Sequence, residues 1–285
     1  MLKNSPIRNI MKKVKTPQIS IYAQGLDHPE GLAIDHHGVI WCGGEEGQVY
    51  RISKQGKKIE TVAQVGGFNL GFAFSPAGDL YFCNHKVPAI FKLNPLTLKT
   101  EIFCDQILGK KVRTPNHLVF DRKGILYVSD SGEWGKKNGA IYRINSQGKG
   151  EIWMKNLSYP NGVALDREDK ALYVVQTFLN NTLRIPIQSH GEAGKSSLYA
   201  QNLKEAPDGL VFDRRGNLYI CCYGNSRIYR ITPQRKKEVF AQDPIGLTLN
   251  RPTNLIYREK PQEALLAANL GGYHLSSILI TKENK

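Results

Sequence analysis

The sequence repeats one short motif six times, at intervals of 40 to 47 residues. The first copy reads Pro-Glu-Gly-Leu-Ala-Ile-Asp at residues 29–35, and each later copy opens a similar run. An ungapped alignment puts one residue of every copy in the same position, which we call the slot: Glu30, Leu70, Asn116, Asn161, Asp208 and Thr253. A repeat of this length indicates that the chain folds as an array of equivalent structural units.

Each unit contains four short segments that are rich in β-branched and aromatic residues. Gly, Pro, Asn and Asp bound these segments, which is the pattern of strands joined by tight turns. No stretch of useful length shows the 3.6-residue periodicity of a helical repeat. The sequence therefore predicts an all-β fold, a six-bladed β-propeller with four antiparallel strands per blade.

The order of the segments predicts how the ring closes. Fourth-strand segments follow the first five units, at residues 58–65, 99–104, 149–155, 196–201 and 237–242. The chain ends after a third strand, whereas an unassigned strand over residues 18–23 precedes the first unit. We expect this N-terminal strand to complete the last blade, because that pairing removes a free sheet edge.

Charge and composition narrow the expected partners. The net charge is +14, and five basic residues lie in the first 16, which we predict to be a poorly ordered basic lead-in before a single propeller domain over residues 17–285. No basic stripe interleaved with aromatic residues suggests nucleic acid, and no apolar run approaches the length of a membrane span. We expect a small-molecule substrate and a monomer or weak homo-oligomer.

The five cysteines indicate a reducing compartment. Their number is odd, four occupy second-strand positions, and none has the spacing of a zinc site. We expect them to be reduced and buried, and the protein to be cytoplasmic. The lead-in also lacks the apolar core of a secretory signal.

Propeller topology gathers polar residues at one mouth of the central channel. First strands line the axis, so the slot residues converge there, and second strands end at the same face. Those ends carry Glu45, Asn84, His85, Asp130, Ser131, Gln176, Thr177, Tyr223 and Asn269. The slot itself holds Glu30, Asn116, Asn161 and Asp208, whose side-chain oxygens suit a hard cation.

Two interpretations of these four oxygen-bearing residues remain open. Asn and Asp after Pro commonly cap turns where a loop meets a strand. Two carboxylates converging near an axis would however repel each other unless a cation neutralised them. We expect one divalent cation, calcium first, with magnesium, manganese or zinc as alternatives. His117 should be structural and point away from the channel, since it follows Asn116 on the same strand.

The motifs resemble those of the senescence-marker-protein/gluconolactonase/luciferin-regenerating-enzyme family, to which regucalcin belongs. The resemblance covers residues 18–282 and rests on Pro-Glu-Gly at 29–31, Pro-Asn-Gly at 160–162, Pro-Asp-Gly at 207–209 and Ala-Asn-Leu-Gly-Gly at 268–272. It implies a six-bladed propeller with one cation, usually calcium, at the axial mouth. Its implied ligands are Glu30, Asn116, Asn161 and Asp208, and Asp208 is implied to be a general base.

Two local patterns refine that resemblance. Regucalcin-type members carry Arg-x-Asn-Asp-Gly before the third blade, where the Arg and Asp contact sugar hydroxyls. Here the run is Arg113-Thr114-Pro115-Asn116-His117, with Arg displaced by one and His in the Asp position. The pair Asn84-His85 resembles an Asn-His pair of the related paraoxonases, whose His is proposed to activate water.

These observations predict a metal-dependent hydrolase of lactones, gluconolactonase-like or a broader lactonase and esterase. Water would attack a carbonyl polarised by the cation, with Asp208 or His85 as the base. The expected substrate-binding residues are Arg113, Asp130, Tyr223 and Asn269. The alternatives are a non-catalytic propeller that binds a ligand or partner, or a phosphotriesterase or lyase at the same site. Loops 104–114, 131–139 and 243–251 should set the substrate.

Overall fold

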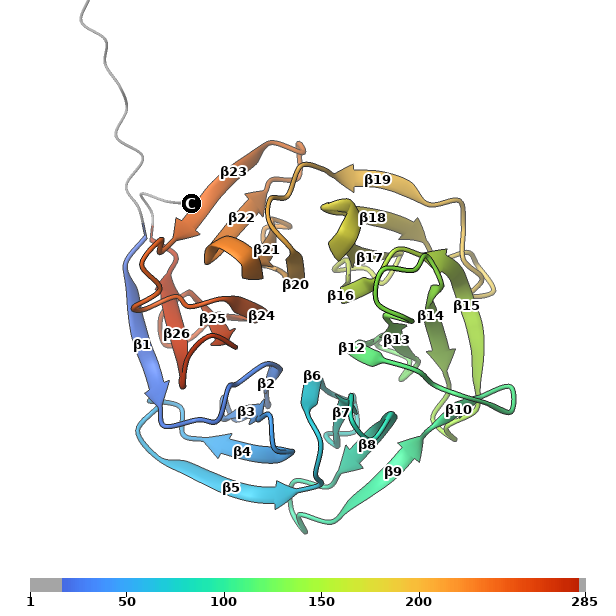
Figure 1. Ribbon diagram of the computed structural model, residues 1–285, viewed down its shortest axis with the longest axis horizontal. Helices are drawn as coiled ribbons and strands as arrows, with labels where there is room; N and C mark the ends of the chain where they lie inside the picture. Colours follow the sequence, from blue (N-terminus) through green and yellow to red (C-terminus); the bar gives the residue numbers. More distant parts are fainter. Residues whose placement is uncertain (1–16, 282–285) are drawn as a thin grey trace, which may run out of the picture.

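The computed structural model describes residues 17–281 and shows a ring of six antiparallel sheets around a central axis (Figure 1). The expected six-bladed propeller with four strands per blade is confirmed. The lead-in over residues 1–16 and the last four residues lie outside the described residues. Within them there is no α-helix, only two short 3₁₀ turns, and no helix has the length and apolar character that a membrane crossing requires.

The strands follow the chain around the ring. Blade 1 comprises β2 (Leu32–Ile34), β3 (Ile40–Gly43), β4 (Gln48–Ile52) and β5 (Ile59–Gln64). Blade 2 comprises β6 (Asn69–Phe74), β7 (Leu80–Asn84), β8 (Ala89–Leu93) and β9 (Thr100–Cys104). Blade 3 comprises β12 (Pro115–Phe120), β13 (Leu126–Asp130), β14 (Gly139–Ile144) and β15 (Gly150–Leu157). Blade 4 comprises β16 (Pro160–Leu165), β17 (Ala171–Gln176), β18 (Asn181–Pro186) and β19 (Ser197–Ala200). Blade 5 comprises β20 (Pro207–Phe212), β21 (Leu218–Cys222), β22 (Arg227–Ile231) and β23 (Lys237–Gln242). Blade 6 comprises β24 (Pro252–Arg258), β25 (Ala264–Asn269), β26 (His274–Leu279) and β1 (Ile19–Gln24). A hairpin of β10 (Gln106–Ile107) and β11 (Lys110–Lys111) joins blades 2 and 3, and 3₁₀ turns η1 (Thr177–Leu179) and η2 (Tyr223–Asn225) follow β17 and β21.

The ring closes as the sequence predicted. Strand β1 pairs antiparallel with β26, with Ile19 opposite Ile278 and Gln24 opposite His274. Figure 1 shows β1 as the outermost strand of the blade that also contains the C-terminal strands. The closing strand spans residues 19–24, one residue later than expected, and it leaves no blade with an unpaired third strand.

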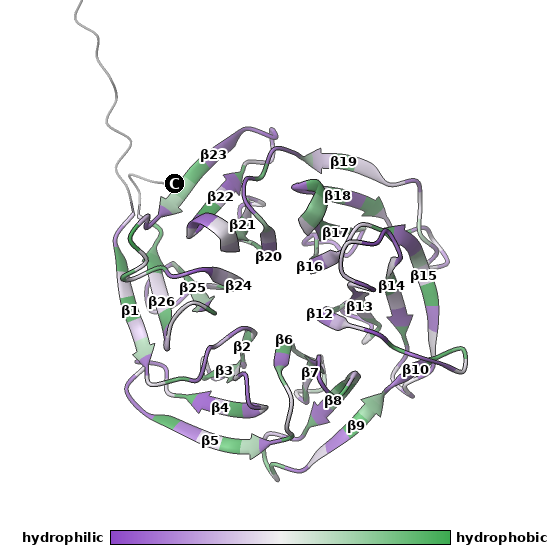
Figure 2. Cartoon of the chain, viewed as in Figure 1, coloured by the Kyte–Doolittle hydropathy of each residue, from purple (hydrophilic) through white to green (hydrophobic). Residues whose placement is uncertain are grey.

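The hydrophobic core lies between the blades. Six clusters of buried apolar side chains form, one at each interface between neighbouring blades. Tyr50, Tyr142 and Tyr229, which occupy equivalent repeat positions, each pack in one of these clusters. Outermost strands such as β5 and β15 contain both hydrophilic and hydrophobic residues, because one side of these strands faces solvent (Figure 2). All five cysteines are buried and unpaired, as expected.

The glycine of the Pro-x-Gly motif sits where neighbouring inner strands touch. A Cβ on Gly31 would lie 1.8 Å from the carbonyl oxygen of Leu70 in the next blade. A Cβ on Gly162 would lie 2.5 Å from the carbonyl oxygen of Asp208, again one blade on. In the four blades that carry this glycine, it allows the first strand to approach the first strand of the next blade more closely than a side chain would permit.

We expect Gly31→Ala to lower the free energy of unfolding by about 3 kcal/mol, because the new methyl group collides with backbone that cannot rotate away. Gly66→Ala is the matched control: its backbone is left-handed (φ 72°) but its Cβ would meet no atom within 4 Å. Gly66→Ala should lower the free energy of unfolding by only about 1 kcal/mol, which is the cost of placing an alanine in a left-handed backbone conformation. Chemical denaturation measures both, and equal losses would show that the interstrand contact is not tight.

Candidate functional site

One mouth of the channel holds a cavity of about 310 Å³. All six slot residues line it, so the repeat alignment identified a ring of side chains that meet in space. In five blades the ladder between the first two strands shifts register at or just beside the slot. Such bulges re-aim side chains, which places the slot residues toward the axis.

A second tier of residues forms the wall above the slot ring. One group lies two positions before the slot: Phe68, Thr114, Tyr159 and Ala206. The other group directly follows a second strand: His85, Thr177, Tyr223 and Leu270. The two groups are tied together, since the N–H of His85 donates to the carbonyl of Phe68 (2.9 Å) and that of Tyr223 to Ala206 (3.0 Å). Only Trp134, from the β13–β14 loop, has no place in this pattern. Counting two positions back from each slot would have found Phe68 and Tyr159, which sequence reasoning missed.

The floor of the cavity carries the four oxygen-bearing slot residues. Glu30, Asn116 and Asn161 are buried, and Asp208 is partly accessible from the cavity. Glu30 Oε2 and Asn161 Oδ1 are buried without any hydrogen-bond partner. Asn161 Nδ2 lies 3.4 Å from Thr177 Oγ1, which itself donates to the carbonyl of Pro207 (2.9 Å). Unpartnered buried oxygens are costly, so their presence on one floor needs an explanation.

The two carboxylates of the floor influence each other's ionisation. Burial raises the pKa of Glu30 well above its ordinary value, and the nearby charge of Asp208 raises that pKa further. Burial likewise raises the pKa of Asp208, and a hydrogen bond from Asn161 opposes that rise. Two carboxylates in one poorly solvated site disfavour double ionisation unless a positive charge joins them.

This donor set fits a hard divalent cation. Two carboxylates and two amides offer oxygen ligands only, which calcium and magnesium prefer. Glu30 and Asn161, whose Oε2 and Oδ1 atoms lack partners, both line this cavity, and a cation bound between them would give both atoms a partner. Glu30, Asn116, Asn161 and Asp208 could therefore hold a metal ion at this floor.

A hydrogen bond spans the channel below the floor. Glycine follows the slot in four repeats, whereas His117 and Asn254 take that position in blades 3 and 6, which lie opposite each other (Figure 1). His117 Nδ1 accepts from the Val163 N–H (3.3 Å), so Nε2 carries the proton and donates to Asn254 Oδ1 (3.1 Å). Burial lowers the pKa of His117 to about 4, so the ring is neutral. His117 is structural as predicted, but it reaches across the channel, because the bulge between Pro115 and His117 breaks the strand's alternation.

Three predicted substrate-binding residues do not line the cavity. Asp130 is buried and accepts hydrogen bonds from the N–H groups of Arg113 (2.7 Å), Thr114 (3.1 Å) and Gly132 (2.9 Å). The Arg113 side chain points instead to Glu133, with 3.5 Å between Nη1 and Oε1. Asn269 is buried, accepts from the Asn250 N–H (2.8 Å) and donates to Ser276 Oγ (2.8 Å). Asp130 and Asn269 thus hold rim loops in place and have no free group for a substrate.

Of the other residues predicted at the mouth, His85, Thr177 and Tyr223 line the cavity, whereas Glu45, Asn84, Ser131 and Gln176 do not. His85 is exposed at the rim and lines the cavity. Tyr223 also lines it, and its hydroxyl accepts a hydrogen bond from Arg251 Nη1 (3.1 Å). Ser131 is buried and donates to the carbonyl of Pro160 (2.8 Å), which leaves its hydroxyl engaged in joining two blades.

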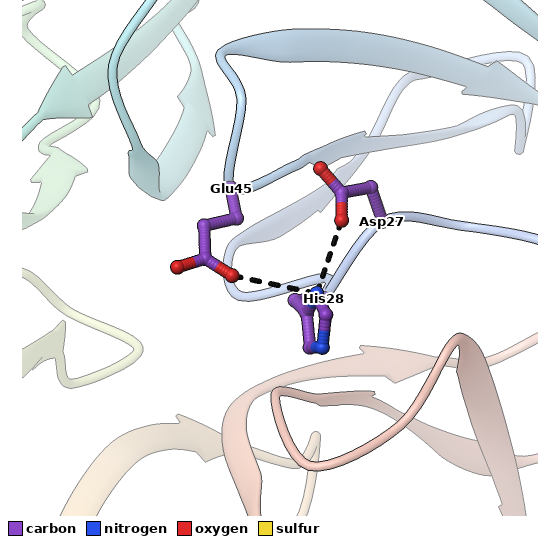
Figure 3. A group of neighbouring side chains, drawn as sticks. All are labelled: Asp27, His28 and Glu45. Carbon is purple, nitrogen blue, oxygen red and sulfur yellow. Dashed lines mark hydrogen bonds and ion pairs between the residues drawn. The ribbon is translucent and has the colours of Figure 1, made fainter.

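A separate group of potential metal ligands lies on the rim of blade 1 (Figure 3). His28 Nδ1 lies 3.0 Å from Asp27 Oδ1 and 3.4 Å from Glu45 Oε2. All three side chains are partly exposed, and Asp27 also accepts a hydrogen bond from Gln48 Nε2 (3.0 Å). These mutual contacts account for the cluster without an ion, and none of its members belongs to the slot.

Comparison with known protein sequences identifies relatives. The family model described as SMP-30/Gluconolactonase/LRE-like region matches residues 63–262. A gluconolactonase of Zymomonas mobilis is 26% identical over an alignment of 226 residues that covers 70% of this chain and 60% of that protein. Lactonase drp35 of Staphylococcus saprophyticus is 33% identical over 224 residues, covering 74% of this chain and 68% of that protein. The chain thus spans about 60% of the length of the first relative and about two thirds of the second.

Solved structures share the architecture. A gluconolactonase of Xanthomonas campestris superposes with a TM-score of 0.80 at 18% identity, covering 94% of this chain and 91% of that chain. A calcium-binding regucalcin of Agrobacterium tumefaciens superposes with a TM-score of 0.71 at 17% identity, covering 91% and 94% of the two chains. At these identities the likeness establishes the fold of the ring.

Proposed function

This chain belongs to the SMP-30/gluconolactonase/LRE-like family, and from that premise we propose that it is a metal-dependent lactonase acting at the axial cavity. The observation that carries the proposal is the cavity floor, where two carboxylates and two amides meet and two of their buried oxygens lack partners. A purely structural channel has no need of such a floor. The lactonases among the relatives in turn favour a cyclic ester as the substrate.

The proposed cation ligands are Glu30, Asn116, Asn161 and Asp208. A bound divalent cation would neutralise the two carboxylates and, as a Lewis acid, polarise a substrate carbonyl. Calcium suits oxygen-only ligands that include neutral amides, although magnesium or manganese also bind such sites. The polypeptide's own contribution is to hold the ligand residues in place. Thr253 Oγ1, for example, donates to the backbone carbonyl of Glu30 (3.1 Å) and so ties blade 6 to blade 1.

Asp208 is the proposed general base. It is the one floor carboxylate that remains partly accessible, so a water molecule in the cavity can reach it. The water oxygen bonds to the carbonyl carbon, Asp208 takes the water proton, and the ring C–O bond breaks. The proton then passes to the leaving alkoxide, which gives a hydroxy acid. His85, exposed on the cavity wall, is the second candidate for this proton transfer.

Metal analysis combined with a hydrolysis panel tests the proposed function. We expect one divalent ion per chain, and hydrolysis of at least one member of a panel of short-chain, acyl-homoserine and aldonic lactones. Chelation should remove the activity and added calcium should restore it. Aryl esters and organophosphates in the same panel separate a lactonase from an esterase or phosphotriesterase. Full activity in metal-free protein would refute metal dependence.

A further inference from the structure

An aromatic cluster forms one side of the cavity wall. The ring of Trp134 lies 5.1 Å from that of Tyr159 and 4.8 Å from that of Phe178, and the last two are 4.9 Å apart. Trp134 and Tyr159 both line the cavity. Trp134 nevertheless keeps 75% of its surface exposed, so much of its indole ring is available for contact. Exposed aromatic surface in a concave site is a common anchor for apolar ligand groups.

The loop that carries Trp134 is fixed by buried polar contacts. Asp130 accepts from the Gly132 N–H (2.9 Å), and Thr114 Oγ1 donates to the Gly132 carbonyl (2.9 Å). Further along the loop, the Glu133 N–H donates to Asn138 Oδ1 (2.9 Å). The backbone that carries Trp134 is therefore fixed before a ligand arrives, which reduces the entropy lost on binding.

Three hydroxyl groups of the wall are already engaged within the protein, and the exposed His85 at the rim is the main polar side chain left for a ligand. The hydroxyls of Thr114 and Thr177 donate to backbone carbonyls, and that of Tyr223 accepts from Arg251. Apolar side chains line much of the rest of the cavity, including Phe68 and Leu270 in the wall and Leu70 in the slot ring. A sugar lactone brings several hydroxyls, and each one that is buried here without a partner would weaken binding.

We propose that this cavity selects lactones that carry an apolar alkyl or aryl substituent over polyhydroxylated sugar lactones. The inference rests on the proposed function, since it places the ester carbonyl at the floor. The substituent then lies against Trp134 and Tyr159, where it replaces water on the exposed indole face. Each methylene group that is buried there should raise kcat/KM by about fourfold.

Three δ-lactones test this selectivity on the metal-loaded wild-type protein: the unsubstituted ring, the ring with a hexyl chain, and glucono-δ-lactone. We expect kcat/KM for the hexyl compound to exceed that of both others by at least about tenfold, since only part of the chain can be buried. Comparable or faster hydrolysis of glucono-δ-lactone would overturn the inference while leaving the lactonase proposal intact.

Substitutions of Trp134 in the β13–β14 loop test whether this residue is responsible for the preference for apolar substituents. Trp134→Ala should lower the ratio of kcat/KM for the hexyl lactone over the unsubstituted ring by about fivefold, mainly through KM, and Trp134→Phe should retain most of that ratio. Leu247→Ala is the matched control, because Leu247 is 69% exposed on another rim loop and does not line the cavity. An unchanged ratio in Trp134→Ala would contradict the inference.

Binding of non-hydrolysable lactams separates the two proposals. The δ-lactam with a hexyl chain should bind at least about tenfold more tightly than the unsubstituted δ-lactam, as measured by calorimetry. If no lactone is hydrolysed but this difference is found and depends on Trp134, the hydrolase proposal fails and the apolar site stands. Equal affinities would reject the apolar site whatever the activity.

Discussion

Asp208→Asn is expected to lower kcat for lactone hydrolysis by at least about a thousandfold. Loss of a general base alone typically costs a factor of 10² to 10⁴, because the attacking water keeps its proton in the transition state. The amide retains a carbonyl oxygen of nearly the same position, so the cation should still bind, though more weakly. Steady-state kinetics at saturating calcium measure kcat, and metal analysis of the same sample reports occupancy.

Glu205→Gln is the matched control for Asp208→Asn. Glu205 lies on the same approach to β20 and is exposed, so its replacement removes one negative charge from that segment without touching the floor. We expect wild-type kinetics from it. If Asp208→Asn kept more than a tenth of the wild-type kcat with the metal bound, the base would have to be another group, and His85→Gln would be the next variant to measure.

The repeat predicted both the ring and its floor because a propeller converts a sequence period into rotation about an axis. Residues at one repeat position must then lie on one circle, and Glu30, Asn116, Asn161 and Asp208 do line one cavity. The strand order also predicted closure by β1, since a blade lacking its fourth strand would leave an exposed sheet edge.

What the repeat could not predict is where each side chain finds its hydrogen bonds. Asp130 and Asn269 end second strands at the correct face, yet both turn to backbone N–H groups of neighbouring loops. The predicted direction of the His117 side chain, away from the channel, was wrong because a bulge shifts the register of β12. Trp134 lies in the β13–β14 loop, which is longer than the equivalent loops of the other blades, so no other repeat has a position to compare with it.

Glu30→Gln is expected to change stability in opposite directions with and without the cation. In chelated wild-type protein, the floor holds two carboxylates that burial and mutual repulsion make hard to ionise. Replacing Glu30 by an amide removes one charge and supplies a donor for Asp208, so the chelated variant should gain about 2 kcal/mol, or roughly 4 °C in Tm. In excess calcium the wild type should be stabilised by about 4 kcal/mol at a thousandfold excess over Kd, whereas the variant should gain much less.

The pH dependence of the chelated wild type follows from the same two pKa values. Both folded-state pKa values lie above those of the unfolded chain, so the folded protein binds more protons and loses stability as the pH rises through the folded pKa values. The Tm of the chelated wild type should therefore fall from pH 5 to pH 8, and that of chelated Glu30→Gln should fall less steeply.

Glu46→Gln is the control for the calcium effect. It removes an exposed carboxylate of the same blade and should leave the calcium-induced shift in Tm unchanged. A calcium shift of wild-type size in Glu30→Gln would exclude Glu30 as a ligand.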